Sequence, residues 1–230
     1  MIGIIGAMEI EVRTLIETMT DVKEEKISGS TFYKGTLDGK SVVVAQSGIG
    51  KVAAAICAES MILRYSPALL INTGVAGSLT SELNVTDVAV ADRAVQHDMD
   101  TSPLGDPVGL ISGINKIYFE AEKKAVDLFL KEGEKLGVKV KAGLIASGDQ
   151  FIAGAEKKNA ILSLFPDAVA CEMEGAAIAH VAYLNNTPFV TVRAISDCAD
   201  GSSPMDYPSF VAKAAKTSFA MTRAFVAAYN

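Results

Sequence analysis

The chain has 230 residues, half of them hydrophobic, and a formal net charge of −6 at pH 7. That length suits one α/β domain with a substantial core, which Ala, Val, Ile and Gly must largely build because Trp is absent. The net negative charge argues against non-specific binding to nucleic acid and favours a small soluble ligand.

Cysteine and histidine usage restricts the protein class further. The three cysteines, Cys57, Cys171 and Cys198, form neither a CxxC pair nor an even set, which is typical of reduced thiols. Two histidines leave little from which to build a metal site. No basic segment precedes an apolar core at the N-terminus, and no apolar run approaches the ~20 residues that cross a bilayer. We therefore expect a cytoplasmic protein that binds no metal and no membrane.

The N-terminal third predicts a strand, a helix and a hairpin. Residues 1–7 are a strand-like apolar run, and residues 9–20 carry apolar side chains at helical spacing. Glu9 and Glu11 lie at this strand-to-helix junction, where they either complement the helix dipole or face a ligand. Residues 24–46 alternate in polarity around Asp38-Gly39, a strong two-residue hairpin signal.

A glycine-containing turn at residues 47–51 opens an alanine-rich helix that is expected to run to about residue 65. A P-loop would need glycine at position 45 and Ser or Thr at 52, where Ala45 and Val52 stand. A dinucleotide fingerprint would need an acid after the next strand, which residues 70–72 do not offer. We therefore favour a simple tight turn, and keep Ile49 as a possible ligand contact.

The middle of the chain alternates predicted strands, loops and a helix. We predict strands at 68–72, 87–95 and 138–147, a small-residue loop at 73–78 and a charged helix at 116–136. Residues 96–113 read as a loop too long to be only a connection, so we expect it to be functional or to lie at an interface. At the turn formed by 148–152, Phe151 and Ile152 are either a buried pair or a surface that stacks on a planar ligand.

Three acids follow two apolar, strand-like runs near the C-terminus. Glu172 and Glu174 follow the first and would point to one side of an extended backbone, with Met173 on the other. Asp197 ends the second run, predicted as a strand at 188–195. A single acid at such a position is as well explained by a loop or a helix N-terminus as by a ligand site. Three acids at two strand ends favour a ligand site. Arg193, within the second run, needs a carboxylate partner, for which Glu172 or Glu174 would serve.

Two further helices complete the predicted order. An apolar helix at 175–184 makes His180 a packed or partly exposed residue rather than a ligand, and a helix at 209–229 closes the domain. The order predicts a three-layer α/β/α sandwich around a central mixed β-sheet. The sequence has no GxSxG elbow and no plausible Cys/His/Asn set. Carboxylates without these groups suit a cation-like transition state, and glycosidic bond cleavage is the leading case.

Six motifs, in this order along nearly the whole chain, resemble those of the 5′-methylthioadenosine/S-adenosylhomocysteine nucleosidases of the nucleoside phosphorylase superfamily. They are Gly6-Ala-Met-Glu-Ile-Glu11, Ser47-Gly-Ile-Gly-Lys51, Asn72-Thr-Gly-Val-Ala-Gly77, Ser147-Gly-Asp-Gln-Phe-Ile152, Glu172-Met-Glu174 and Arg193-Ala-Ile-Ser-Asp197. The resemblance implies one nucleoside phosphorylase-like catalytic domain over residues 1–230, no cofactor, and a cytoplasmic homodimer. It also implies hydrolysis of the adenine–ribose bond of methylthioadenosine, adenosylhomocysteine and 5′-deoxyadenosine, in methionine salvage and the recycling of S-adenosylmethionine by-products.

The resemblance also implies roles for single residues. Glu11 would activate water, Glu174 would hold the ribose hydroxyls, and Asp197 would donate a proton to adenine N7. An acid that donates a proton near neutral pH needs a raised pKa, and the base needs the reverse. The remaining implied contacts are the backbone around Phe151 and Ile152 at the adenine edge, Met173 under the ribose, Met8 and Ile49 at the 5′-thio group, Gly77 at the substrate, and Ser196, Glu172 and Arg193 as support.

Departures from the family pattern leave the substrate preference open. Val75 stands where known members have a serine, Leu104 where an aromatic residue of the partner subunit would cover the 5′ group, and Tyr207 where a Phe would stand. Aminofutalosine therefore remains a further candidate substrate. A phosphorylase of the same fold would need cations where Glu9 and Glu11 stand, although Arg13 keeps it open. A nucleoside-binding protein without activity is the other alternative.

Overall fold

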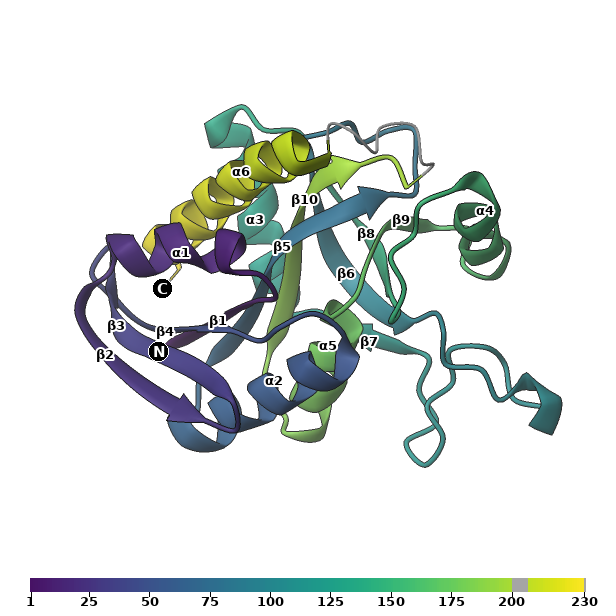
Figure 1. The fold of residues 1–230 in the computed structure, drawn as a ribbon, viewed down its shortest axis with the longest axis horizontal. Coiled ribbons are helices and arrows are strands. Elements are labelled where there is room, and N and C mark those ends of the chain that lie inside the picture. The colour runs from purple at the N-terminus through teal and green to yellow at the C-terminus, as the bar shows by residue number, and fades with distance from the viewer. Residues whose placement is uncertain (200–206, 230) are drawn as a thin grey trace.

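The computed structural model describes residues 1–199 and 207–229 (Figure 1). The helices are α1 (Glu9–Thr18), α2 (Lys51–Tyr65), α3 (Lys123–Leu136), α4 (Ala155–Leu164), α5 (Gly175–Leu184) and α6 (Tyr207–Ala228), with a 3-10 turn η1 (Ser102–Leu104). The strands are β1 (Ile2–Gly6), β2 (Thr20–Ile27), β3 (Ser30–Leu37), β4 (Lys40–Gln46), β5 (Leu69–Ser78), β6 (Val88–Gln96), β7 (Tyr118–Glu120), β8 (Val140–Ser147), β9 (Ala168–Glu172) and β10 (Phe189–Asp197). Within the described residues no helix combines the length and apolarity needed to cross a bilayer.

The described strands form one mixed, ten-stranded sheet that curls back on itself. The strand order is β10-β6-β8-β9-β5-β1-β4-β3-β2, with β7 beside β6 and a further pairing of β10 with β5. This last pairing, which is parallel from Phe189 opposite Leu70 to Asp197 opposite Gly77, closes five strands into a ring. β1 pairs in parallel with both β4 and β5, and the β2–β3–β4 meander extends the sheet from there.

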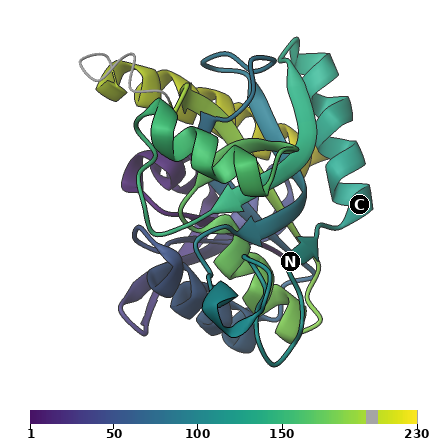
Figure 2. The same ribbon diagram turned by 90° about the vertical axis from the view of Figure 1, so that its right-hand side faces the viewer.

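Helices cover both faces of the sheet because its central strands are apolar on both sides. On one face, Ile4 of β1 and Ile71 of β5 pack in the same buried cluster as side chains of α1, α3 and α6. On the other face, Ile5 and Leu70 pack with α2 and α5. This confirms the predicted α/β/α sandwich around a mixed sheet. In the turned view of Figure 2, α4 (green) crosses in front of the sheet.

Several predicted elements are confirmed to within a few residues. The hairpin around Asp38-Gly39 joins β3 and β4, and both turn residues have positive φ, as a two-residue hairpin turn requires. The predicted helices at 51–65 and 175–184 match α2 and α5. The last strand extends two residues beyond the prediction and includes Asp197.

Other predicted elements are wrong. Residues 73–78, predicted as a loop, continue β5 as a fully paired strand, because burial and pairing with β10 and β9 outweigh the weak strand preference of its small residues. The helix predicted at 116–136 begins only at Lys123, after the short strand β7. The helix α4 and the charged strand β2 were not predicted.

The topology brings the carboxyl ends of two groups of strands together. β1 and β10 run parallel to β5, and β8 runs parallel to β9. β9 runs antiparallel to β5 and pairs with it at Gly77 opposite Cys171 and Ser78 opposite Ala170, so the two groups meet at their carboxyl ends. The carboxyl ends of strands are where α/β proteins commonly bind ligands. The segment between β6 and β7, which contains η1, projects from the body of the molecule (Figure 1).

Candidate active site

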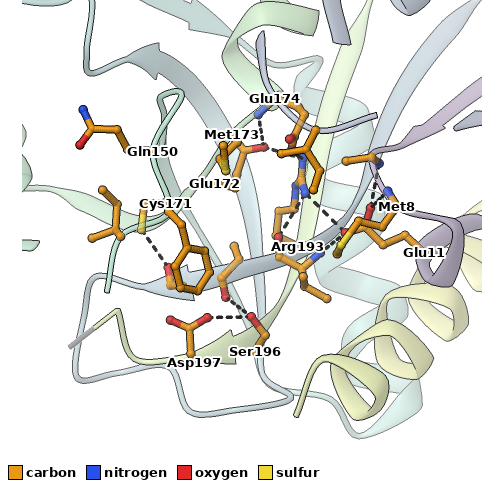
Figure 3. A pocket seen from close by; sticks show the side chains of 17 residues that line it. Met8, Glu11, Gln150, Cys171, Glu172, Met173, Glu174, Arg193, Ser196 and Asp197 are labelled. Atoms are coloured by element: carbon orange, nitrogen blue, oxygen red, sulfur yellow. Dashed lines mark hydrogen bonds and ion pairs between the residues drawn. The ribbon is translucent and has the colours of Figure 1, made fainter. Parts of the chain in front are cut away.

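A cavity opens where these strand ends meet, and six separate segments line it (Figure 3). Three segments are the C-terminal parts of β5, β9 and β10, two follow the ends of β1 and β8, and the sixth, residue 49, precedes α2. The lining residues are Ala7, Met8, Glu11, Ile49, Val75, Ala76, Gly77, Gln150, Phe151, Ile152, Cys171, Glu172, Met173, Glu174, Arg193, Ser196 and Asp197.

One guanidinium group with three carboxylates near it organises the base of the cavity. Arg193 is 1% exposed, and its Nη2 donates to Glu172 Oε2 at 2.5 Å and to Glu174 Oε2 at 3.2 Å. Glu11 Oε1 lies 3.9 Å from Nη1. Burial alone would lower the pKa of Arg193, but the three carboxylates outweigh burial and raise it. When all four side chains are ionised, the three carboxylates outnumber the single guanidinium group, so the cluster has a net negative charge.

Glu172 lines the cavity and also ties its supporting elements together. Its Oε2 accepts the backbone N–H groups of Glu174 at 3.0 Å and Gly175 at 2.7 Å, at the first turn of α5, in addition to Arg193. Its Oε1 accepts a hydrogen bond from the Ser147 hydroxyl at the end of β8. A carboxylate this fully bonded holds β8, β9, β10 and α5 together, and its position at a helix N-terminus stabilises its charge.

Glu11, in the first turn of α1, is held by the backbone around it. Oε2 accepts the N–H groups of Ala7 at 2.8 Å and Met8 at 2.9 Å, and Oε1 accepts that of Val75 at 3.0 Å. Burial raises the pKa of Glu11 above its ordinary value, although Arg193 and the three N–H groups oppose the shift. The expectation of a lowered value is therefore wrong, because desolvation dominates. A raised pKa makes Glu11 a stronger base when it is ionised.

Glu174 is the N-cap residue of α5 and lines the cavity next to Arg193. Its Oε1 accepts the N–H of Gly50 at 2.9 Å, from the turn that opens α2. Burial raises the pKa of Glu174 to about 7, with the negative charges of Glu172 and Glu11 adding to the rise and Arg193 opposing it. One of the three acids therefore exchanges its proton near neutral pH.

Asp197 is fixed at the end of β10, away from the arginine cluster (Figure 3). Its Oδ2 accepts the Ser196 hydroxyl at 2.8 Å, and its Oδ1 accepts the N–H of Ala199 at 2.8 Å. Gly77 of β5 lies against it, since a Cβ built there would come within 3.0 Å of Oδ1. The points at which β5 touches Glu11 (Val75) and Asp197 (Gly77) are two residues apart, about 6.6 Å along a strand.

The structure brings most predicted site residues to this one cavity and leaves Leu104 apart from it. Met8, Glu11, Ile49, Gly77, Phe151, Ile152, Glu172, Met173, Glu174, Arg193, Ser196 and Asp197 all line it. Leu104 is instead 84% exposed on η1. Tyr207 begins α6, and its side chain lies outside the described part of the structure.

The open choices in the sequence resolve in different ways. Phe151 is 53% exposed and Ile152 is 6% exposed, so the two do not form a buried pair. His180 is partly buried and stacks on Phe119 with ring centroids 5.1 Å apart, as expected of a packed helix residue. The predicted partners of Arg193 are confirmed, because both Glu172 and Glu174 bind it.

Sequence reasoning missed several residues of the site. Ala7 contributes its N–H to Glu11, the Ala76 carbonyl accepts the Ser196 hydroxyl at 3.3 Å, and Cys171 Sγ donates to the Gly77 carbonyl at 3.7 Å. Asn72 accepts Arg193 Nη2 through its Oδ1 at 2.6 Å, and a buried polar residue at the centre of an apolar strand was a signal for it. Gln150 stands inside the turn that was singled out, between Asp149 and Phe151.

Comparison with known proteins gives concordant results. The family model of the Phosphorylase superfamily matches residues 1–227. A 5′-methylthioadenosine/S-adenosylhomocysteine nucleosidase of Actinobacillus succinogenes is 43% identical over 226 residues, with 98% of each chain covered. The crystal structure of the nucleosidase of the same name from Neisseria meningitidis, in complex with methylthio-immucillin-A, has a TM-score of 0.95 at 36% identity and 98% coverage of both chains.

A structure with a different name is also similar. The futalosine hydrolase of Helicobacter pylori has a TM-score of 0.92 at 37% identity, covering 98% of this chain and 96% of that one. Both the sequence similarity and the common fold extend over the full chain, and they agree with the family that the motifs with their acids at strand ends indicated. The chain therefore belongs to the phosphorylase superfamily and, within it, to the 5′-methylthioadenosine/S-adenosylhomocysteine nucleosidases.

Proposed function

We propose that this protein hydrolyses the N-glycosidic bond of 5′-methylthioadenosine and S-adenosylhomocysteine, releasing adenine and the 5′-substituted ribose. The observation that carries the proposal is the placement of Glu11 and Glu174 around Arg193, with Asp197 in the same cavity. Cleavage of a glycosidic bond passes through an oxocarbenium-like transition state. An excess of fixed negative charge beside the sugar stabilises such a cation.

Each acid has a separate task in this reaction. Glu11, whose pKa burial raises, takes a proton from the attacking water, and Asp197 donates one to adenine N7 as the base leaves. The two acids contact β5 at different residues, Glu11 at Val75 and Asp197 at Gly77, so they are held at separate places in the cavity as their separate tasks require. Glu174, in its ionised form, accepts hydrogen bonds from the ribose hydroxyls, and Met173 lies under the sugar.

The remaining cavity residues would recognise the rest of the substrate. The backbone around Phe151 and Ile152, beside Gln150, meets the edge of adenine, with Gly77 and Ser196 near Asp197. Met8 and Ile49 offer apolar surface to the 5′-thio group. Tyr207 would add to that surface. The same pocket would accept 5′-deoxyadenosine, which lacks the thioether but keeps the nucleoside.

The charge distribution favours hydrolysis over phosphorolysis. Among the described residues that line the cavity, Arg193 is the one cation, and it is bound by two carboxylates with a third 3.9 Å away. Arg13, the other candidate for phosphate, is bound to Glu9 at 2.7 Å on the exposed face of α1. A phosphate dianion entering beside Glu11 would meet like charge.

We further propose that residues 1–230 act as one catalytic domain and that two copies form a homodimer in the cytoplasm. Support for the dimer comes from apolar side chains exposed on η1 and α2, among them Leu104 at 84% and Val52 at 71%. Leu104 would reach the 5′ group in the partner's cavity. Free Cys57, Cys171 and Cys198 support a reducing compartment. Sedimentation equilibrium tests the oligomeric state.

Two substitutions test the reaction and the assigned roles. Glu11→Gln and Asp197→Asn keep side-chain shape but remove the base and the acid, so each should slow adenine release from methylthioadenosine by roughly 10²-fold or more. Glu134→Gln, on the exposed face of α3, is a control that should keep the wild-type rate. Near-wild-type turnover in either cavity variant would remove that residue from the mechanism.

A further inference from the structure

Behind one wall of the cavity, three charged residues form a closed hydrogen-bonded ring that the reaction above does not use. Lys51, the first residue of α2, donates from Nζ to Asp98 Oδ1 at 2.6 Å. Asp98 Oδ2 accepts the backbone N–H of Asp149 at 2.9 Å. Asp149 Oδ1 in turn accepts the backbone N–H of Lys51 at 2.7 Å. The ring joins three segments that are far apart in the sequence.

The ion pair of the ring is sheltered from solvent, whereas Asp149 is exposed. The side chains of Lys51 and Asp98 are 18% and 17% exposed, which makes this pair far less screened than a surface pair. Although burial opposes it, the Lys51 ammonium and the Asp149 N–H lower the pKa of Asp98. Gly50 has a φ of 97°, and a Cβ there would come within 3.0 Å of Asp149 Oδ1, so glycine permits both the turn and the close approach.

The ring touches the cavity at two places. Two consecutive backbone N–H groups at the start of α2 have different acceptors. The N–H of Gly50 donates to Glu174, which lines the cavity, and the N–H of Lys51 donates to Asp149, which belongs to the ring. Asp149 also begins the turn that carries Phe151 and Ile152 into the cavity. Within this turn Ile152 is buried, whereas Asp149 and Gln150 are exposed. The hydrogen bonds of Asp149, among them the one to Asp98, therefore hold the exposed part of the turn.

We propose that Lys51, Asp98 and Asp149 are positioning residues that hold the turn at 148–152 and the Gly50 N–H in place for nucleoside binding. The inference rests on the proposed function, which assigns that turn to the adenine base. Glu11 and Asp197 are held by other groups, so the ring acts on binding of the base more than on the chemical step. Its loss therefore changes KM and adenine affinity first.

Lys51→Met tests the proposal by removing the ammonium group while keeping much of the side-chain volume. Loss of a charge-assisted bond typically weakens an interaction by about 10- to 100-fold. We expect the KM for methylthioadenosine and the Kd for adenine to rise at least about 10-fold, with kcat within about 3-fold of wild type. Lys51→Arg, which keeps the charge, should restore most of the affinity. Lys123→Met, which breaks a surface pair with Asp127, is the control.

The paired substitution Lys51→Met with Asp98→Asn tests whether the ring works as a unit. We expect the double variant to lose no more adenine affinity than Lys51→Met alone, because both changes break the same bond. Additive losses, an unchanged KM, or a fall in kcat without a rise in KM would overturn the proposal. If thermal melting shows that Lys51→Met does not fold, the adenine affinities of the single variants Asp98→Asn and Lys51→Arg are compared instead. The first removes one charge of the pair, and the second keeps both. A wild-type protein that binds adenine but hydrolyses no nucleoside would refute the hydrolase, while adenine affinity would still test the ring.

Discussion

The residue that most constrains this site is a buried arginine rather than any of the acids. Arg193 binds Glu172 and Glu174 directly, and removing one partner of such a buried cluster typically costs 3–5 kcal/mol. The acids that serve the proposed chemistry are therefore also part of the fold. Glu174 shows this double function most clearly, because burial raises its pKa into the physiological range.

Glu174→Gln should flatten the dependence of the free energy of unfolding on pH. The pKa of Glu174 rises from 4.5 to about 7 on folding, so the folded state binds an extra proton between these values. Its contribution to stability is fully present below pH 4.5 and is lost as the pH rises through 7. At about 1.4 kcal/mol per pKa unit, the contribution is on the order of 3 kcal/mol. The amide of the variant does not titrate, so the free energy of unfolding of the variant should change less with pH than that of wild type.

Urea unfolding of wild type and Glu174→Gln at pH 5 and pH 7.5 measures this effect. Glu134→Gln, an exposed change on α3, should reproduce the wild-type slope. A Glu174→Gln variant whose unfolding free energy falls between these pH values as steeply as that of wild type would contradict the assignment.

At the residue scale, the sequence predicted which acids meet but not how each is held. Apolar strands that end in acids indicated Glu172, Glu174 and Asp197, and the family motif indicated Glu11. The backbone groups that bind Glu11 are N–H donors, which every residue except proline carries and no sequence pattern marks. The direction of its pKa shift follows from total burial, which depends on the packing of the whole edge.

At the scale of elements, predictions succeeded where local pattern and tertiary burial agree. The β3–β4 hairpin, α2 and α5 each carry a clear local signal. β2 is a largely exposed edge strand with a mostly charged sequence, so few apolar residues mark where it begins. In α4, Ile161 is the buried residue, which leaves almost no periodic signal for a helix.

The overlooked helix α4 has a structural task next to Asp197. Lys158 donates from Nζ to the backbone carbonyls of Ser78, at the end of β5, and Cys198, just after β10, each at 2.9 Å. Lys158→Met should therefore lower the unfolding free energy by about 1–3 kcal/mol and reduce turnover, because two carbonyls lose a charged donor. The neighbouring Lys157 is exposed, and Lys157→Met should have little effect. Equal unfolding midpoints in urea for the two variants would contradict this account.

At the scale of the whole molecule, the curled sheet explains why one cavity collects residues from six segments. The pairing of β10 with β5 closes five strands into a ring, so strand ends that an open sheet would spread along an edge converge. The sequence predicted the mixed sheet but not this closure, because it depends on long-range pairing of strands that are buried on both faces. The resulting site concentrates carboxylates and contains one cation among the described lining residues.

The most direct test of the account is adenine release from methylthioadenosine by the wild-type protein, with and without added phosphate, with both products identified by chromatography and mass spectrometry. Because Arg193 is already bound by carboxylates, we predict equal rates in both buffers and free 5-methylthioribose as the sugar product. Release that requires phosphate and yields methylthioribose 1-phosphate would contradict the central claim that water, activated at Glu11, is the nucleophile.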